Sequence, residues 1–330
     1  MTFRENPVFG RKVFFIDPPY TIEHKVIEKL KEQEYEVYIL KDYTFAKSVL
    51  RNFENAICFI NIKQQLSLKE WYNYIKSFQY DDTLKSVFLG IMASKVPESS
   101  IEKFIMNLKL PGGYIGLDGI TPEEITKKIS GILEINGAKG KRKYLSLTCS
   151  KDEALTGYIA HGNKLFTMTF ENISSIGISC FLDNDLSKIL VKNTLLTNVS
   201  LSLGRWSVIT QCIVYSINEM NGKTTALLLF AKGTPKETKD SLRKYIYDVL
   251  DKKLQQLIKG STEDNENYFT MTFPSDGQET PDYNPPTEED SEVENAEPLD
   301  EEEDTGKAEE SEAKAPTEIT EEETETKQQS

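Results

Sequence analysis

Residues 166–177 of this 330-residue chain read Phe-Thr-Met-Thr-Phe-Glu-Asn-Ile-Ser-Ser-Ile-Gly. Apolar and hydroxyl side chains alternate from Phe166 to Phe170, which is the period of a strand with one face in a core and the other in solvent. The same alternation returns at Val199–Leu203. This pattern predicts an antiparallel β structure in the second half of the chain.

The other strands expected in this half are also short, and no helix separates them. We expect strands at Leu145–Cys149, Phe166–Phe170, Ile176–Phe181, Val199–Leu203, Ser207–Ile217 and Thr224–Phe230. This arrangement predicts a six-stranded antiparallel barrel, with a sandwich as the alternative. Trp206 is expected to pack against the barrel, because a large aromatic ring gains most from burial.

One helix closes this half of the chain. Thr234-Pro235-Lys236-Glu237 has the pattern of a capping box, and Gly260 marks the end of the helix. Between them one helical face stays apolar, which predicts a packing face against the barrel, with a dimer contact as the alternative. That face carries Leu242, Tyr245, Ile246, Val249, Leu250, Leu254, Leu257 and Ile258.

The first half alternates short apolar runs with amphipathic stretches. Val13–Ile16 and Ile57–Ile60 are continuously apolar, as is typical of strands covered on both faces. Thr121-Pro122-Glu123-Glu124 is a helix-opening pattern. Five β-α repeats predict a doubly wound parallel sheet. Its strands are expected at Val13–Ile16, Glu36–Leu40, Ala56–Ile62, Val87–Met92 and Tyr114–Leu117.

This order and length resemble a response-regulator receiver domain, over residues 12–135. The resemblance implies an acidic pair for Mg²⁺, a phosphate-accepting Asp after the third strand and a Lys after the fifth. The chain has a single Asp17, an Asn61 and an Asp118 at these places. We therefore expect a pseudo-receiver that is not phosphorylated and binds an unidentified protein partner, with Asp17 as a turn residue.

Two short motifs flank the start of the predicted barrel. Lys139-Gly140-Lys141-Arg142-Lys143 precedes its first strand, and Asn172-Ile173-Ser174-Ser175-Ile176-Gly177 follows an alternating strand. Taken singly, the first is also a plausible interdomain linker and the second is also common turn chemistry.

Together and in this order, the two motifs resemble the PilZ domain, a family that binds the bacterial second messenger cyclic di-GMP (c-di-GMP). The resemblance covers residues 139–258. The family pattern is Arg-x-x-x-Arg followed by Asp/Asn-x-Ser-x-x-Gly. It implies that the ligand-binding residues are Arg142, Lys141, Lys143, Asn172, Ser174 and Gly177.

The first motif is incomplete, because Ser146 stands where the family pattern has its second arginine. Arg gives two parallel hydrogen bonds to guanine O6 and N7, or meets phosphate oxygens, and a serine cannot replace it. Losing one such contact costs about 1–3 kcal/mol. Ser146 therefore argues for weakened or lost binding, whereas the complete Asn172-x-Ser174-x-x-Gly177 motif argues for a functional site.

The charge of the chain is unevenly distributed. Its net charge is −14, but residues 261–330 alone contain 25 Asp or Glu and 3 Lys, a net charge of −22. The preceding 260 residues therefore have a net charge of +8, which suits an anionic ligand. We expect residues 261–330 to form a disordered acidic tail, either solubilising or regulatory, because they carry few apolar residues.

No sequence pattern indicates an enzyme, a cofactor or a metal site. The histidines are too few for a histidine-based site and the cysteines are widely spaced, so we expect buried thiols. We expect no DNA or RNA partner. Residues 1–11 form an N-terminal extension without a signal or membrane segment, so we expect a cytoplasmic protein without membrane insertion. The two histidines are His24 and His161, and the four cysteines are Cys58, Cys149, Cys180 and Cys212.

Two functions fit these observations. The first is a c-di-GMP receptor in which residues 136–260 bind the nucleotide and residues 12–135 pass the change to a protein partner. The second is an adaptor that binds no nucleotide and acts only through protein-protein interactions.

Overall fold

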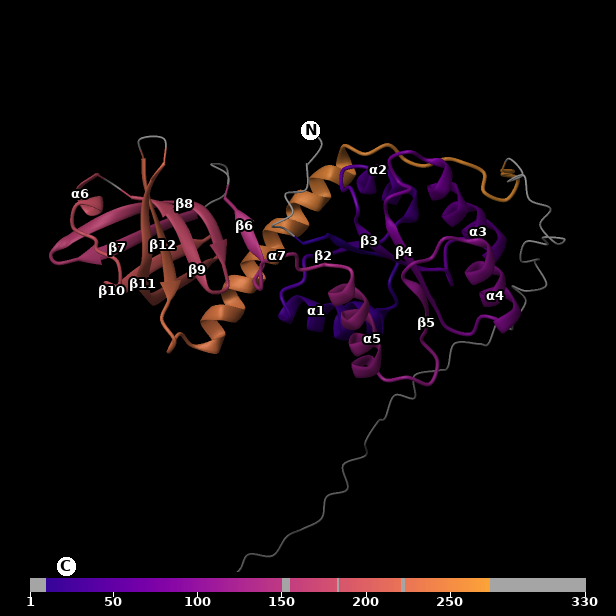
Figure 1. Cartoon of the computed structure of the whole chain (residues 1–330), viewed down its shortest axis with the longest axis horizontal. Helices are drawn as coiled ribbons and strands as arrows, with labels where there is room; N and C mark the ends of the chain where they lie inside the picture. The colour runs from indigo at the N-terminus through magenta and orange to yellow at the C-terminus, as the bar shows by residue number, and fades with distance from the viewer. Residues whose placement is uncertain (1–9, 150–154, 183, 221–222, 274–330) are drawn as a thin grey trace, which may run out of the picture. The chain divides into compact units, whose positions relative to one another are not determined.

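The computed structural model describes residues 10–149, 155–182, 184–220 and 223–273. Within them the chain forms a five-stranded and a seven-stranded sheet (Figure 1). The described residues of both sheets belong to one compact unit. Most of the expected N-terminal extension and residues 274–330 of the expected acidic tail lie outside the described residues.

The first sheet is parallel, with strand order β2-β1-β3-β4-β5, a common order of doubly wound folds. All five predicted strands are confirmed to within one residue at each end. Their bounds are β1 Val13–Ile16, β2 Val37–Leu40, β3 Ile57–Asn61, β4 Phe88–Ala93 and β5 Gly113–Gly116.

Helices cover both faces of this sheet, as predicted. Val13 and Phe15 of β1 pack with η1, α1 and α5, whereas Phe14 and Ile16 pack with α2, α3 and α4. The capping box at Thr121 is confirmed. The helices are η1 Ile22–Ile27, α1 Glu28–Glu32, η2 Tyr43–Phe45, α2 Ala46–Leu50, α3 Leu68–Ser77, η3 Phe78–Tyr80, α4 Glu98–Asn107 and α5 Pro122–Ile135.

The second sheet closes on itself as an antiparallel barrel. Strands β8-β7-β10-β11-β12-β9 follow in order, and β9 pairs back with β8 to complete a six-stranded ring. A further strand, β6, pairs with β8. The bounds are β6 Ser146–Thr148, β7 Leu155–His161, β8 Lys164–Ser174, β9 Gly177–Phe181, β10 Leu195–Leu203, β11 Trp206–Met220 and β12 Lys223–Phe230, with the short helix α6 at Asn184–Ser187.

The six-stranded barrel is confirmed, but one of its predicted members was wrong. The expected strand Leu145–Cys149 is β6, which lies outside the closed ring, and the missed strand β7 takes its place. Gly157 interrupts the apolar pattern of β7. A Cβ at this glycine would lie 2.6 Å from the ring of Phe170 and 2.7 Å from Met168, because these side chains fill the space above it.

The closing helix α7 spans Lys236–Lys259 and ends at Gly260, as predicted. The predicted capping box was wrong: the N-cap is Pro235, and no side-chain cap hydrogen bond forms there. The apolar face of α7 packs on the barrel as expected, and it also reaches the parallel sheet. Tyr247 is 5% exposed and donates a hydrogen bond to the backbone oxygen of Tyr35.

A single hydrophobic cluster joins the two sheets through α7. It contains Phe14 of β1, Leu250 of α7 and Leu228 of β12, together with Tyr268 from beyond the helix. One face of the parallel sheet and the interior of the barrel therefore belong to the same hydrophobic cluster.

Residues 261–273 differ from the expected disordered tail, because they return to the α/β region and pack there. Tyr268 is 2% exposed. Its backbone oxygen accepts a hydrogen bond of 2.7 Å from Nδ2 of Asn73 on α3, and the backbone N–H of Asp264 donates to the oxygen of Thr44 at 2.8 Å. One buried aromatic side chain in a polar segment thus orders residues that composition assigned to the tail.

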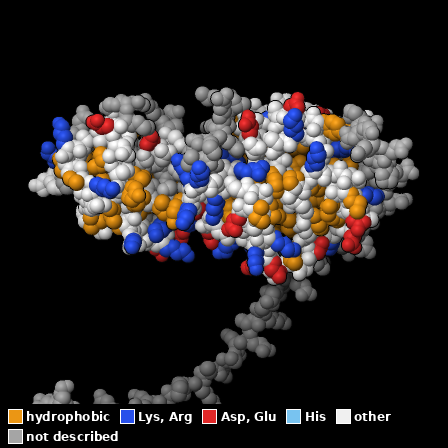
Figure 2. Space-filling view, viewed as in Figure 1, with side chains coloured by type: hydrophobic (Ala, Val, Ile, Leu, Met, Phe, Trp, Pro, Cys, Tyr) orange, Lys and Arg blue, Asp and Glu red, His pale blue; other side chains and the backbone are white. Residues whose placement is uncertain are grey.

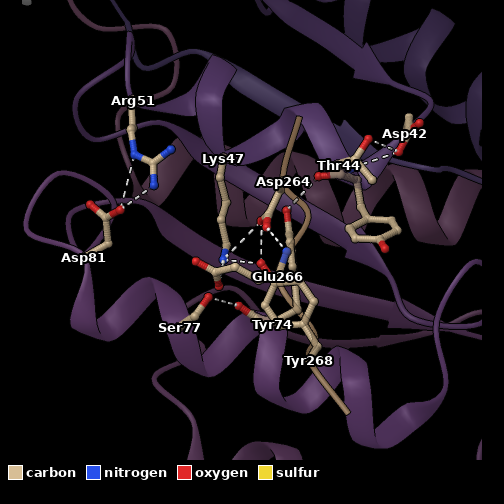
Figure 3. A network of polar contacts seen from close by, with 11 residues as sticks. Asp42, Thr44, Lys47, Arg51, Tyr74, Ser77, Asp81, Asp264, Glu266 and Tyr268 are labelled. Carbon is tan, nitrogen blue, oxygen red and sulfur yellow. Dashed lines mark hydrogen bonds and ion pairs between the residues drawn. The ribbon is translucent and has the colours of Figure 1, made fainter. Parts of the chain in front are cut away.

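The Tyr268 hydroxyl belongs to a buried polar network with Lys47 and Asp264 (Figure 3). Nζ of Lys47 lies 3.3 Å from Oδ2 of Asp264, with both side chains less than a tenth exposed. Burial lowers the pKa of Lys47, and the carboxylates of Asp264 and Glu266 partly offset this. The pair fixes the returning segment, because either charge left alone would be buried without its partner.

Replacing Tyr268 by alanine tests whether this segment is part of the fold. Tyr268→Ala should lower the free energy of unfolding by about 3 kcal/mol, because a buried ring is removed and a cavity is left. Phe269→Ala, at a neighbouring ring that is 41% exposed, should lower it by less than about 1 kcal/mol. Urea unfolding measures both, and equal effects of the two substitutions would contradict the docking of this segment.

Candidate functional site

The Asn172–Gly177 motif forms the hairpin between β8 and β9. Oγ of Ser174 donates to the backbone oxygen of Gly177 at 3.0 Å and accepts from the backbone N–H of Ile176 at 3.4 Å. Ser174 and Gly177 are paired in the ladder, so residues 175 and 176 make the turn. The Ser174 side chain therefore stabilises the turn in this structure.

Gly177 is needed for the packing of the barrel. It lies buried at the start of β9, and a Cβ on it would be 2.4 Å from the backbone oxygen of Leu228 in β12. The close backbone approach expected at this glycine is therefore made to a neighbouring strand.

Strand β6 brings the first motif to the second. It pairs with β8 so that Ser146 lies opposite Ser174 and Thr148 lies opposite Asn172. Oγ1 of Thr148 donates to Oδ1 of Asn172 at 2.9 Å. The position of the missing arginine, Ser146, is thus a direct neighbour of the second motif.

The basic run lies in the connection between α5 and β6. Lys141, Arg142 and Lys143 are exposed. Arg142 lines a small hollow together with Ser146, and Lys141 and Lys143 are not among its lining residues. The other lining residues are Gly10, Glu34, Glu36, Ala138, Lys139, Tyr144 and Leu145. The structure therefore places Arg142 and Ser146 at one hollow, and Ser146 alone is paired with a residue of the second motif.

Three residues that the sequence did not single out also meet at this corner. They are Glu34, which follows α1, Ser175 in the β8–β9 turn and Arg243 of α7. Oγ of Ser175 lies 2.8 Å from Oε1 of Glu34, and Nε of Arg243 lies 3.3 Å from the same oxygen. Arg243 and Glu34 are 209 positions apart in the chain, so no local pattern could have signalled the contact.

The receiver-like positions lie at the ends of β1 and β3 and after β5. Asp17 has a φ of 46°, and its backbone oxygen accepts a hydrogen bond of 2.8 Å from Nδ2 of Asn61. Oδ2 of Asp118 accepts from the backbone N–H of Lys95 at 2.7 Å. In the part of the chain that the structure describes, no group of three or more His, Cys, Asp or Glu is arranged to hold a metal ion.

The cysteines and His24 lie in surroundings that indicate no binding site. Cys58, Cys180 and Cys212 are buried as expected, and burial raises the pKa of Cys180 and of Cys212 to about 12, whereas Cys149 is half-buried. His24 is exposed, with its ring 4.2 Å from that of Tyr20. Among the helices described, none has the length and apolar character needed to cross a bilayer.

Comparisons with known proteins give structural neighbours only, since no family model and no curated protein matches the chain. The PilZ domain of YcgR from Escherichia coli, with c-di-GMP, has a TM-score of 0.32 at 12% identity, over 35% of this chain and 96% of that chain. The MrkH–c-di-GMP complex of K. pneumonia has a TM-score of 0.32 at 15% identity, over 35% and 54%. The Bacillus subtilis inhibitor of motility, MotI/DgrA, has a TM-score of 0.29 at 18% identity, over 34% and 52%.

The matched part thus spans about half of the MrkH and MotI/DgrA chains. The functions of those whole proteins are therefore not carried over to this chain.

A substitution at Gly177 tests the tight packing at this corner. Gly177→Ala should lower the free energy of unfolding by about 2 kcal/mol, because the new methyl group overlaps the backbone of β12. Gly233→Ala is the matched control, since nothing lies within 4 Å of a Cβ there. Thermal or urea unfolding compares the two variants, and a Gly177→Ala protein as stable as Gly233→Ala would contradict the close approach.

Proposed function

We propose that this chain is a non-enzymatic receptor for c-di-GMP, with its site at the corner of β6, β8 and β9. The observation that carries the proposal is the register of β6 on β8, which sets Ser146 beside Ser174, while Arg142 lines the same hollow as Ser146. This pairing supports a single site made from two motifs that are unspecific alone. The expected cytoplasmic location is part of the same proposal.

The chemistry of the corner suits an anionic guanine nucleotide. Arg142 offers a planar guanidinium to guanine O6 and N7 or to a phosphate, and Lys141 and Lys143 add positive charge nearby. Asn172 and Ser174 offer an amide and a hydroxyl to a base edge. Gly177 acts by allowing the hairpin to pack. Figure 2 shows further Lys and Arg side chains near the region of α7 on the face drawn, with Asp and Glu side chains among them.

The position of the basic run supports a route from ligand binding to a protein partner. Residues 139–143 connect α5 to β6, and therefore the parallel sheet to the barrel. A ligand that draws this connection onto the barrel would change how the two regions meet, and the receiver-like region would present a different surface to its partner.

The adaptor function remains the second candidate, on two observations. Ser146 offers no guanidinium, and the side chains of Asn172 and Ser174 already have hydrogen-bond partners within the protein. In this alternative the motif serves the hairpin alone.

Calorimetric titration of the full chain with c-di-GMP separates the two candidates. Under the receptor proposal, Arg142→Ala and Asn172→Ala should each weaken binding about tenfold or more, because each removes a polar contact worth about 1–3 kcal/mol. Lys164→Ala should leave the affinity unchanged, since Lys164 is an exposed cation at the opposite end of β8, about 33 Å along the strand from Ser174. No binding by the unaltered chain at high micromolar nucleotide would favour the adaptor.

Placing an arginine at position 146, where the PilZ pattern has one, should increase the affinity for c-di-GMP. Ser146→Arg should tighten c-di-GMP binding about tenfold, because it returns a bidentate donor beside Ser174. Ser146→Lys adds the same charge without the planar fork and should gain less. Equal gains from Arg and Lys would mean that charge alone acts at this position.

A further inference from the structure

Glu34 places a carboxylate from the parallel-sheet region at the candidate nucleotide site. The residue follows α1 in a left-handed conformation, with a φ of 68°. Its side chain is only 9% exposed. A non-glycine residue in this conformation with a buried acidic side chain requires compensating contacts.

Those contacts are three donors from three separate segments of the chain. The hydroxyl of Ser175 donates to Oε1 of Glu34 at 2.8 Å, and Nε of Arg243 donates to the same oxygen at 3.3 Å. The backbone N–H of Leu145 donates to Oε2 at 3.3 Å. A hydroxyl, a guanidinium and a backbone amide directed at one anionic group are the donor set of an anion site.

This donor set adjoins the candidate site. Ser175 lies between Ser174 and Gly177 in the second motif, and Leu145 lies between the Arg142 run and Ser146. Glu34 lines the same hollow as Arg142 and Ser146. The carboxylate therefore sits where an anionic ligand of this corner would need its donors.

We propose that Ser175, Arg243 and the Leu145 amide form the phosphate subsite of the nucleotide site, and that Glu34 occupies this subsite when no ligand is bound. Arg243 then supplies from α7 the guanidinium that the PilZ pattern has at the position of Ser146. The inference rests on the proposed function, and it adds three binding residues and a competing internal anion.

Arg243 is suited to this role by its second contact. Its Nη1 lies 2.8 Å from Oδ1 of Asp240, one turn earlier on α7, and its side chain is 20% exposed. Burial lowers the pKa of Arg243, but Glu34 and Asp240 raise it by more than burial lowers it. The guanidinium therefore stays charged. Asp240 keeps Arg243 oriented after Glu34 leaves.

Competition between Glu34 and the ligand couples the site to the parallel sheet. The ligand enters only after the Glu34 carboxylate has left its donors. When the carboxylate leaves, a contact between the end of α1 and the barrel is lost. The apparent dissociation constant rises by the inverse of the fraction of molecules in which Glu34 has left. If Glu34 occupies the donors in about 90% of molecules, removing it tightens binding about tenfold.

The test uses the full chain titrated with c-di-GMP by calorimetry. Glu34→Ala should bind about tenfold more tightly than the unaltered protein. Alanine keeps a Cβ at the left-handed position, so the backbone strain is unchanged. Glu32→Ala removes the same charge two residues earlier from an exposed side chain paired with Lys29, and it should change the affinity less than about twofold. Adding Arg243→Ala to Glu34→Ala should weaken binding about tenfold relative to Glu34→Ala.

A second measurement probes the subsite without the nucleotide. Inorganic phosphate, against chloride at equal ionic strength, should raise the Tm of Glu34→Ala more than that of the unaltered chain or of the Glu34→Ala/Arg243→Ala double variant. Equal c-di-GMP affinity in Glu34→Ala and the unaltered chain would overturn the Glu34 inference while leaving the receptor proposal standing. No c-di-GMP binding by any variant would overturn the receptor proposal, and equal phosphate shifts in all variants would overturn the anion subsite.

Discussion

Burial of helix α7 is the constraint on which the rest of the structure depends. Its apolar side chains belong to the same hydrophobic cluster as strands of the parallel sheet and of the barrel. Leu242, Ile246 and Leu250 are each less than a tenth exposed, and a helix so covered cannot leave one sheet without exposing apolar surface to water. The helix therefore positions Arg243 against Glu34 as a consequence of packing.

The polar site is built on backbone pairings that leave little freedom. The β8–β9 turn is closed by the Ser174 hydroxyl, and the absence of a side chain at Gly177 lets β9 approach β12. A one-residue slip of β6 on β8 would remove Ser146 from Ser174 and turn the buried Leu147 toward solvent. The apolar side of β6 thus fixes the register that brings its polar side to the motif.

The sequence predicted the parallel sheet well, because Val13–Ile16 and Ile57–Ile60 are unbroken apolar runs that strands buried on both faces require. The sequence-based prediction missed β7, because Gly157 breaks the apolar pattern of this strand. The side chains of Phe170 and Met168 fill the space beside this glycine. The prediction failed again at Tyr268, whose burial depends on a pocket formed by distant residues. At the candidate site, the sequence indicated the two motifs but not the contact between Glu34 and Arg243, since that contact arises only from tertiary packing.

The return of residues 261–273 to the α/β region has a topological consequence. The chain leaves the parallel sheet after α5, builds the barrel and α7, and is fastened again at Asp264 and Tyr268. The barrel is thus an inserted domain attached at both of its ends. A single tether would restrain the barrel less than two attachments, because the second attachment closes the intervening chain into a loop. A ligand at the proposed site would therefore act on a barrel that is held at two points of the chain and by the cluster around α7.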